Sequence, residues 1–195
     1  MQWQSADLNV FETILARRSV RSYRAADPDR KTLTTLLEAA VRAPTAVHEE
    51  PWAFVIVQNR PLLKRLSEKA KPLFAKELQR SAEPRSKQVL EDYANPDFNI
   101  FHNAGTLILI CAMSFGPFVT ADCWLAAENL MLAACAMGLG SCVIGSALPA
   151  LEIQEVKSEL DIPAKYSVIV PIIVGYPLDA TPMTSRREPM ILAWL

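Results

Sequence analysis

The sequence lacks the short motifs that identify the commonest nucleotide-binding and nucleophilic sites. It contains no GxxxxGK[ST] phosphate-binding loop and no GxSxG nucleophile elbow. Its one glycine-rich string, residues 138–145, follows an expected helix and precedes an expected strand, whereas the dinucleotide fingerprint needs a strand followed by a helix. The chain therefore gives no support for a P-loop protein, an α/β-hydrolase or a Rossmann dinucleotide-binding protein.

Cysteine and histidine are scarce, and neither is arranged for metal binding. None of the four cysteines forms a CxxC pair, and all lie in apolar surroundings, which predicts small buried hydrophobic residues. His48 and His102 are far apart and neither has a metal-ligand spacing, so we expect no zinc or other metal site. The cysteines are Cys111, Cys123, Cys135 and Cys142.

The chain also lacks a basic field and the pattern of a secretory signal. Its net charge is −1, which argues against nucleic acid as a partner. Met1–Ser5 has neither the basic start nor the apolar stretch of a secretory signal, so we expect a cytoplasmic protein. The longest apolar region, Trp124–Leu148, is interrupted by Glu128, Asn129 and three glycines, which predicts a buried helix followed by a strand and no membrane partner.

What is present is typical of a globular domain. Of the 195 residues, 51% are apolar and 21% are charged, which is enough apolar surface for a substantial core. There is no internal repeat and no shift in composition that would mark a second domain. We therefore expect one domain over residues 1–195.

Helical and strand patterns alternate along the chain, which predicts a mixed α and β class. The clearest helix begins at Asp27-Pro28, where Asp is the expected cap, and ends before Pro44. Pro171 lies inside the last strand and predicts an edge position, a bulge or a break there. Residues 80–103 are polar and are expected to hold a short helix within a loop. The other expected helices are residues 8–17, 61–79, 120–137 and 149–160, and the expected strands are residues 53–57, 106–113, 141–144 and 166–174.

Two segments at element boundaries carry the strongest functional signal. Arg17-Arg18-Ser19-Val20-Arg21 places three guanidinium groups and a hydroxyl within five residues, and Ala43–Trp52 is a turn-rich loop that leads into an apolar strand. Cationic donors and free backbone groups at such boundaries can converge on an anion. The alternative is that the arginines are solvated or ion-paired and the loop is only a connection. Because the chain has few titratable groups suited to catalysis, we expect a phosphate-bearing cofactor to supply the reactivity.

Five motifs, in the same order, resemble those of the nitroreductase family of FMN-dependent NAD(P)H oxidoreductases, and the likeness covers nearly the whole chain. The motifs are Arg17–Arg21 for RRSxR, Ala43–Trp52 for APS-x-x-N-x-Q-PW, Asp122–Gly145 for the buried helix and strand, Val174–Pro177 for the closing GYP, and Arg186-Arg187 with Pro189 for the basic C-terminal element.

This resemblance implies the fold and the assembly. The fold would be α+β, with three α-β-α layers, a central mostly antiparallel sheet and a long buried helix. Two chains would form an intertwined homodimer, with two FMN molecules at the interface, each touched by both chains.

The resemblance also assigns residues to the phosphate end and the pyrimidine edge of FMN. Arg17, Ser19 and either Arg186 or Arg187 would hold the 5′-phosphate by charge-assisted hydrogen bonds. Arg21 matches the family position near the pyrimidine edge, where a cation stabilises negative charge on the reduced ring and raises its reduction potential.

Two further groups would contact the isoalloxazine ring. Pro44, Thr45 and Ala46 would line it from one side. Gly145 and Ser146 would approach it from the other, with a backbone N–H available to N5.

Some positions depart from the family pattern or keep a second interpretation. His48 stands where the loop usually has Asn, and Glu50 where it usually has Gln. Both are predicted to contact FMN, and the two replacements bear on substrate preference and turnover more than on FMN binding. Arg18 is included among those contacts, with a structural or solvent-facing role as the alternative. Glu128 and Asn129 are expected to be packing or interface groups.

Three aromatic residues also keep two interpretations. Trp52 is expected in the core rather than against the flavin. Phe115 and Phe118 could line a substrate pocket, although core aromatic residues look the same in sequence.

The expected function is hydride transfer from NADH or NADPH through flavin N5 to a nitroaromatic, quinone or similar acceptor, in alternating half-reactions. No side chain is predicted to be catalytic, since FMN would carry the chemistry. Two alternatives remain open: a module that binds FMN with little turnover, and a specialised enzyme such as a flavin-destroying enzyme or a reductive dehalogenase.

Overall fold

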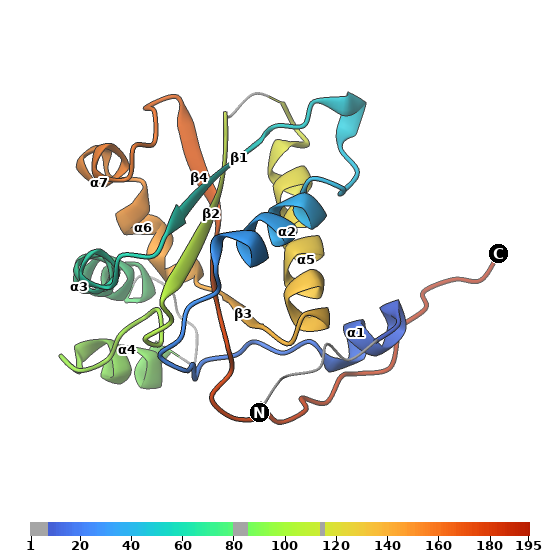
Figure 1. Cartoon of the computed structure of the whole chain (residues 1–195), viewed down its shortest axis with the longest axis horizontal. Helices are drawn as coiled ribbons and strands as arrows, with labels where there is room; N and C mark the ends of the chain where they lie inside the picture. Colours follow the sequence, from blue (N-terminus) through green and yellow to red (C-terminus); the bar gives the residue numbers. More distant parts are fainter. Residues whose placement is uncertain (1–7, 80–85, 114–115) are drawn as a thin grey trace.

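A single antiparallel sheet forms the centre of the molecule. The computed structural model describes residues 8–79, 86–113 and 116–195 (Figure 1). The strands lie in the order β1-β2-β4-β3, and every ladder is antiparallel. They are β1 (Trp52–Val57), β2 (Thr106–Met113), β3 (Gly140–Val143) and β4 (Tyr166–Gly175).

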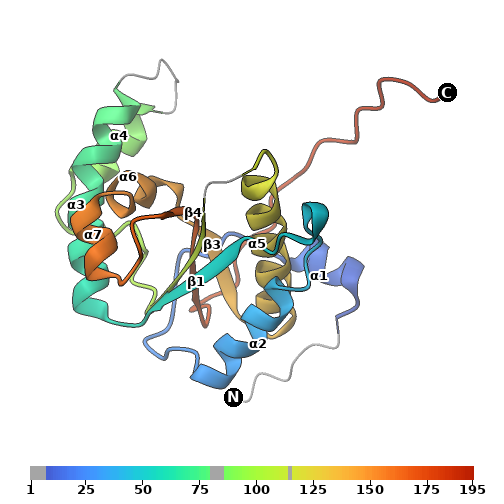
Figure 2. The ribbon, with the colours of Figure 1, turned by 90° about the horizontal axis from the view of Figure 1, so that it is seen from above.

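Helices cover both faces of this sheet and produce three layers (Figure 2). Side chains of a strand alternate between its faces, so Leu107 and Leu109 of β2 join one buried cluster while Ile108 and Ile110 join the other. On the first face lie α3 (Arg60–Leu78), α4 (Ser86–Ala94), α6 (Leu148–Leu151) and α7 (Gln154–Glu159). On the second lie α2 (Arg30–Ala40) and α5 (Val119–Ala136), with α1 (Val10–Ala16) against α5. The expected three-layer α+β architecture is confirmed.

The long helix α5 is apolar around nearly its whole circumference, but only one side of it is covered. Ala126, Ala127 and Leu130 are fully buried against the sheet, as expected. On the opposite side, Trp124 and Leu125 are 46% and 45% exposed. The predicted buried helix is therefore confirmed on the side that meets the sheet, whereas the outer side of α5 faces away from the sheet.

Two helix boundaries differ from the sequence prediction. The cap of α2 is Asp29 rather than Asp27, and its carboxylate accepts the backbone N–H of Thr32 at 2.8 Å. A cap must accept the N–H two or three residues after it, and Asp29 stands directly before the helical residues. The single helix expected over residues 149–160 is two helices, α6 and α7, because Ile153 between them has extended backbone (ψ 131°).

Pro171 lies in an interior strand, so the edge alternative is wrong and the bulge alternative is confirmed. The pairing of β2 with β4 shifts between Ile110 and Cys111, which leaves Ile169 as the extra residue. The carbonyl of Pro171 accepts the N–H of Ile144 at 2.9 Å, just past the end of β3. Pro171 therefore lies just beyond the residues of β4 that pair with β3, where no ladder hydrogen bond from its nitrogen is needed.

The remaining segments agree with the sequence prediction where they are described. A short helix, α4, lies within residues 86–103, and the chain from Leu178 to Leu195 contains no helix or strand. Among the described residues, no helix has the length and apolar character needed to cross a bilayer. Ser114, Phe115 and residues 80–85 lie outside the described residues.

Burial of the cysteines is confirmed for three of the four. Cys111, Cys123 and Cys142 are buried, and Cys135 is partly buried. Burial raises the pKa of the Cys111 thiol to about 12 and that of Cys123 to about 11. These thiols are therefore protonated at neutral pH and act as small hydrophobic groups.

Candidate anion and cofactor site

The arginine-rich segment runs along the outer edge of β3. Ser19 forms a parallel bridge with Ser141, and the N–H of Val20 donates to the carbonyl of Ser141 at 3.0 Å. Val20 is 6% exposed and lies over Gly140, where a Cβ would stand only 2.7 Å from the Val20 side chain. The absence of a side chain at Gly140 thus lets the segment approach the sheet.

A polar pocket of about 310 Å³ brings this segment together with the C-terminal tail. Arg186 lies in the pocket wall, whereas Arg187 does not. Either arginine was a candidate for the phosphate, and Arg186 is the one that lies beside Arg17, Ser19 and Arg21. The remaining lining residues are Arg18, Thr181, Pro182 and Thr184.

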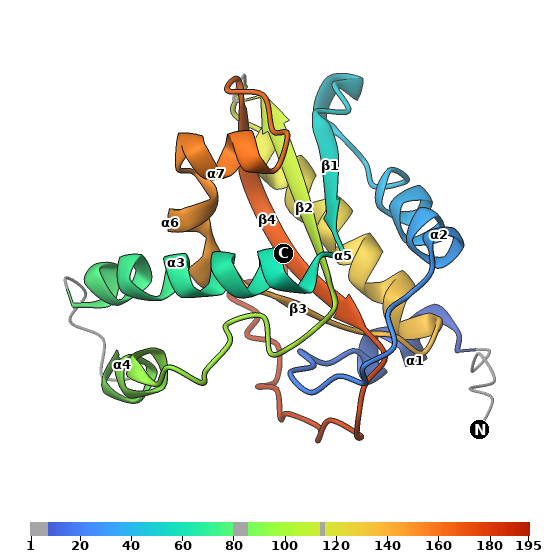
Figure 3. The same cartoon turned by 60° about the vertical axis from the view of Figure 1, so that its left-hand side comes forward.

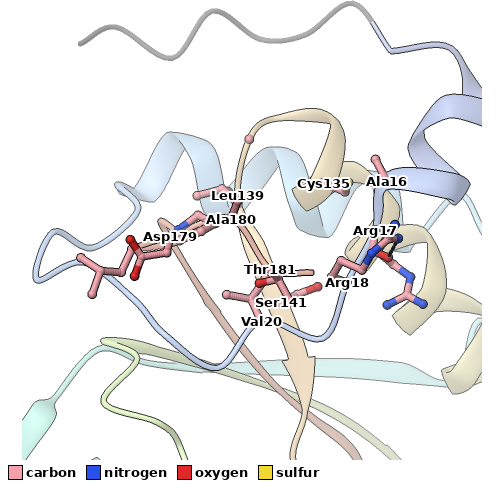
Figure 4. Close-up of a pocket in the computed structure, with 13 residues that line it drawn as sticks. Ala16, Arg17, Arg18, Val20, Cys135, Leu139, Ser141, Asp179, Ala180 and Thr181 are labelled. Atoms are coloured by element: carbon pink, nitrogen blue, oxygen red, sulfur yellow. Dashed lines mark hydrogen bonds between the residues drawn. The ribbon is translucent and has the colours of Figure 1, made fainter. Parts of the chain in front are cut away.

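A second pocket of about 300 Å³ adjoins the first and shares Arg17, Arg18 and Thr181 with it. Figure 4 shows the two arginines at one end of this pocket and Asp179 with Ala180 at the other. Its lining is mainly apolar and includes Val20, Leu139 and Cys135. Thr181 and Thr184 were not singled out from the sequence, since hydroxyl residues in an irregular tail carry no recognisable pattern.

Arg17 and Arg18 differ in how their charges are compensated. The Nε atom of Arg17 lies 3.5 Å from an oxygen of Glu128 on α5, which orients its guanidinium group. Arg18 donates from Nη1 to the carbonyls of Leu15 and Arg17, and its buried Nε has no partner among the described residues. An unpaired buried N–H beside a pocket is a donor that an anion could satisfy.

Arg21 sets the electrostatic character of the region behind the pocket. Its charge acts with burial to lower the pKa of His102, burial being the larger cause. Burial raises the pKa of Cys142 and of Tyr23, and in both cases Arg21 opposes the shift. His102, Cys142 and Tyr23 are therefore neutral at physiological pH, and none of them compensates the charge of Arg21.

The loop Pro44–Glu50 lies at the opposite end of the sheet from this cluster. It precedes Trp52, which aligns through β2 with Ser167 of β4, whereas Ser19 aligns through Ser141 with Val174. With a rise of about 3.3 Å per residue, Ser167 and Val174 are roughly 23 Å apart. Figure 3 shows the loop before β1 and the segment after α1 at the two ends of the sheet. One chain therefore does not bring Pro44, Thr45 and Ala46 to the arginines.

Backbone conformation in this loop is unusual for residues other than glycine. Val47, His48 and Glu50 have φ values of 49°, 57° and 44°, within the left-handed region. All three side chains are exposed, and those of His48 and Glu50 make no hydrogen bond or ion pair with the described part of the chain. Their functional groups are free to meet a ligand or a second chain.

Gly145 and Ser146 lie in a 3₁₀ turn, η2 (Gly145–Ala147), after β3. A Cβ at Gly145 would meet no atom within 4 Å, so the space beside it is open. Ser146 forms a side-chain hydrogen bond with Tyr93 of α4, and burial raises the pKa of Tyr93. Tyr93 could not be singled out from the sequence, because the contact joins two segments far apart in the chain.

The aromatic residues singled out from the sequence occupy different environments. Trp52 is partly buried and packs against the cluster between the sheet and α5, as expected of a core residue. Phe118 is 56% exposed at the start of α5, and Phe115 lies outside the described residues. Asn129 donates to the carbonyl of Ala39 at 3.2 Å and ties α5 to α2, which is the packing role expected of it.

Comparison with known proteins identifies what this arrangement is similar to. The family profile described as "Nitroreductase family" matches residues 14–176. A protein of Archaeoglobus fulgidus, whose name assigns it provisionally as an NADH dehydrogenase/NAD(P)H nitroreductase, is 30% identical over 87% of this chain and 86% of its own. An iodotyrosine deiodinase of Thermotoga neapolitana is 26% identical over 93% of this chain and 96% of its own. The crystal structure of a nitroreductase with bound FMN from Bacteroides fragilis superposes with a TM-score of 0.80, at 29% identity, over 96% of this chain and 98% of that one.

Proposed function

The chain belongs to the nitroreductase family, and from that premise we propose that it is an FMN-dependent oxidoreductase that uses NADH or NADPH to reduce a small organic acceptor. The observation that carries the proposal is the convergence of Arg17, Ser19, Arg21 and Arg186 on one pocket. Three guanidinium groups and a hydroxyl from distant parts of the chain form a donor set suited to a phosphate. When bound, FMN would supply the hydride-transfer chemistry.

The residues present fit the phosphate end of FMN. Arg17 and Arg186 would donate charge-assisted hydrogen bonds to the phosphate oxygens, and Glu128 would keep Arg17 in place. Arg18 would contribute the unpaired N–H that it holds beside the pocket. Only Arg17 of this set forms an ion pair among the described residues, so Arg21 and Arg186 would bind the anion by charge as well as by geometry.

Arg21 would tune the cofactor electrostatically. A fixed cation near the pyrimidine edge favours the reduced, more negative ring and thereby raises the reduction potential. The neutral state of neighbouring His102 and Cys142 leaves this charge uncompensated by them. Gly145 and Ser146, in an open turn, would present backbone N–H groups near N5.

A second copy of the chain would complete the site. The pocket of about 310 Å³ is at the lower end of the range for small-molecule sites, so it suits the phosphate end better than a whole FMN. The loop with Pro44, Thr45 and Ala46 lies too far away to contact the same molecule within one chain. A homodimer would bring the loop of one copy to the arginines of the other.

Uncovered apolar side chains support this assembly. On α1, Phe11, Ile14 and Leu15 are 74%, 52% and 68% exposed, while Thr13 faces inward at 5%. Exposed apolar residues also occur on the outer side of α5 and in the tail, at Leu192 and Trp194. A second chain in the proposed homodimer would cover these side chains.

The proposal is tested by the visible absorbance spectrum of the purified protein, before and after anaerobic addition of NADH or NADPH. Flavin bands that bleach with either nucleotide would support the oxidoreductase and identify the donor. Bands that persist would indicate an FMN-binding module with little turnover. A colourless protein that takes up no added FMN would remove the proposal.

A matched pair of arginine variants tests the phosphate assignment. Arg186→Ala should weaken FMN binding by about tenfold or more, because a charge-assisted hydrogen bond contributes about 1.5–3 kcal/mol. Arg187→Ala, which removes the same charge one residue further on and outside the pocket, should change the affinity by less than about threefold. Equal losses in the two variants, measured by flavin fluorescence titration, would contradict the assignment of Arg186.

A second candidate function is reductive removal of halide from a halogenated phenol. It is favoured by the match to an iodotyrosine deiodinase over nearly the whole of both chains. The reduced protein should be offered 3-iodotyrosine and a nitroaromatic compound in parallel. Release of iodide with no nitro reduction would select the second function, and the reverse would select the first.

A further inference from the structure

Asp122 is a buried carboxylate to which the proposed function gives no role. It lies in the first turn of α5 and is 3% exposed. Its two oxygens lie 3.2 and 3.3 Å from the backbone nitrogen of Ala46, in the loop before β1. No cation forms an ion pair with it among the described residues. A buried carboxylate without a cation is costly, so the hydrogen bond from the Ala46 N–H is important for its stability.

This contact satisfies a backbone donor at the start of a short helical turn that has no side-chain cap. Ala46 is the first residue of the 3₁₀ helix η1 (Ala46–His48), and Thr45, at the cap position, makes no side-chain hydrogen bond. Asp122 accepts the N–H of the first residue of η1, which a side chain at Thr45 would not satisfy, because a cap accepts the N–H two or three residues after it. The position of Asp122 near the start of α5 favours its negative charge.

The loop needs such a fixed point because its backbone is strained. Three of the four residues that follow Ala46, namely Val47, His48 and Glu50, have left-handed φ values. Left-handed backbone costs about 1–2 kcal/mol per residue outside glycine, and such conformations persist only where the surroundings impose them. The side chain of Glu49 in this loop lies close to Gly116, since one Glu49 oxygen is 3.5 Å from the point where a Cβ on Gly116 would stand.

From these contacts we propose that Asp122 is a positioning residue, which holds the Thr45–Glu50 loop in the conformation that meets the isoalloxazine ring bound by a second copy of the chain. The inference rests on the proposed function, because it assigns the loop to a flavin site. Asp122 touches neither cofactor nor substrate and acts through the Ala46 N–H. Its carboxylate thus links the main buried helix to the cofactor.

The first test compares two substitutions in the full-length protein. Asp122→Ala removes the acceptor, and Asp122→Asn keeps an acceptor oxygen while removing the charge. FMN affinity should fall about tenfold or more in Asp122→Ala and remain within about threefold of wild type in Asp122→Asn, because an unmade buried hydrogen bond is costly. Asn129→Ala is the matched control, since it deletes a hydrogen bond from the same helix to Ala39, away from the loop.

Two further measurements separate positioning from general stability. Amide hydrogen exchange of residues 46–50 in the FMN-free protein should accelerate in Asp122→Ala and stay unchanged in Asn129→Ala. The visible circular dichroism of bound FMN should also change in Asp122→Ala alone, since it reports the surroundings of the ring. A structural role without positioning would lower stability and leave both signals unchanged.

Removal of the donor instead of the acceptor provides an independent variant if Asp122→Ala does not fold. Proline is compatible with the first position of a helical turn, and Thr45 has the extended backbone that precedes proline (ψ 147°). Ala46→Pro should weaken FMN binding about as much as Asp122→Ala, and the double variant should lose no more than either alone. Additive losses would contradict the inference.

The outcomes distinguish this inference from the function on which it rests. If wild-type protein binds no FMN, the proposed function fails, while faster exchange at residues 46–50 in Asp122→Ala still supports the loop contact. If wild type binds FMN and Asp122→Ala binds it equally well with unchanged exchange, the inference is overturned and the proposed function stands.

Discussion

At the scale of single residues, the arginines show that one residue type takes different roles according to its surroundings. Arg17 is oriented by Glu128, Arg18 is held by two backbone carbonyls, and Arg186 reaches the same pocket from the far end of the chain. Their side chains are chemically identical, so the differences come from which acceptors lie within reach. Replacement by lysine would keep the charge and lose the planar fork that matches a phosphate.

Val47 is the position where a single change should stabilise the FMN-free chain. It is a β-branched residue with φ of 49° and is 81% exposed, so it bears the left-handed strain without compensating burial. Asparagine tolerates this backbone better, and Val47→Asn should raise the free energy of unfolding in urea by about 0.5–1 kcal/mol. Val41→Asn, at an exposed valine with ordinary backbone (φ −72°), should give no gain.

His102 should make the stability of the chain depend on pH. Its pKa is lowered from 6.5 in the folded protein, by burial first and by Arg21 second. The unfolded chain therefore takes up a proton more readily, so folded stability should fall as the pH drops below about 6.5. His102→Asn, which suits the left-handed backbone there (φ 51°), should lose less stability than wild type between about pH 7.5 and about pH 5.

The comparison uses urea unfolding at both pH values, so a constant loss from the Phe98 ring contact with His102 cancels. The exposed histidine is removed in the control, His48→Asn. An unchanged pH dependence in His102→Asn would show that other groups dominate the transition.

At the scale of elements, α5 serves two purposes because its two sides face different surroundings. The inner side fills the core between sheet and helix, and its first turn carries Asp122 toward the loop. The outer side exposes Trp124 and Leu125, which the described part of the chain leaves uncovered. A helix that is apolar all round would be explained by an interior on one side and, in the proposed homodimer, an interface on the other.

Two leucines on opposite sides of α5 test this division. Leu130 is fully buried, so Leu130→Ala should lower the free energy of unfolding by about 2–5 kcal/mol through the cavity it leaves. Leu125→Ala should cost less than about 1 kcal/mol in the dissociated chain, because its side chain is 45% exposed there. Denaturation at protein concentrations low enough to dissociate any dimer gives both values, and similar losses would contradict the division.

At the scale of the whole molecule, the predicted cofactor contacts fall into two groups separated by the length of the sheet. The arginines lie at the β3 edge near Val174, and the loop lies beyond the far ends of the central strands near Ser167. A two-fold dimer is the simplest arrangement that joins such groups, because each copy then supplies both halves. The site would be built from surfaces that one chain cannot bring together.

Mixing two defective chains tests this arrangement. Arg17→Ala with Arg186→Ala removes the phosphate contacts, and Thr45→Arg places a long side chain where the ring would lie. Each variant alone should bind little FMN. Co-expression at equal amounts should restore about a quarter of the wild-type sites, because half of the dimers would be mixed and each would hold one intact site.

Flavin content of the purified mixture gives the measurement. Recovery would require that a site draws on both chains. No recovery, in a mixture shown by mass spectrometry to contain mixed dimers, would mean that each site lies within one chain.

The sequence alone determined the elements and the residue types of the site. Apolar periodicity gave β2 with its observed bounds and placed the other long elements within one to three residues, because a buried strand or helix must repeat its apolar positions with the period of its backbone. The arginine segment and the loop were also found from the sequence, because clustered arginines and turn residues are recognised from neighbouring positions along the chain. The sequence predicted the wrong cap for α2 and one helix in place of two over residues 149–160, where local propensity is ambiguous.

Only the tertiary structure decided which of these residues meet. Arg186 rather than Arg187 enters the pocket, Asp122 reaches Ala46 across 76 positions, and Tyr93 reaches Ser146. The fold also separates the loop from the arginines within one chain, which local patterns do not reveal. These contacts depend on the packing of helices on a sheet, and the energy of that packing is shared among residues with no fixed spacing along the sequence.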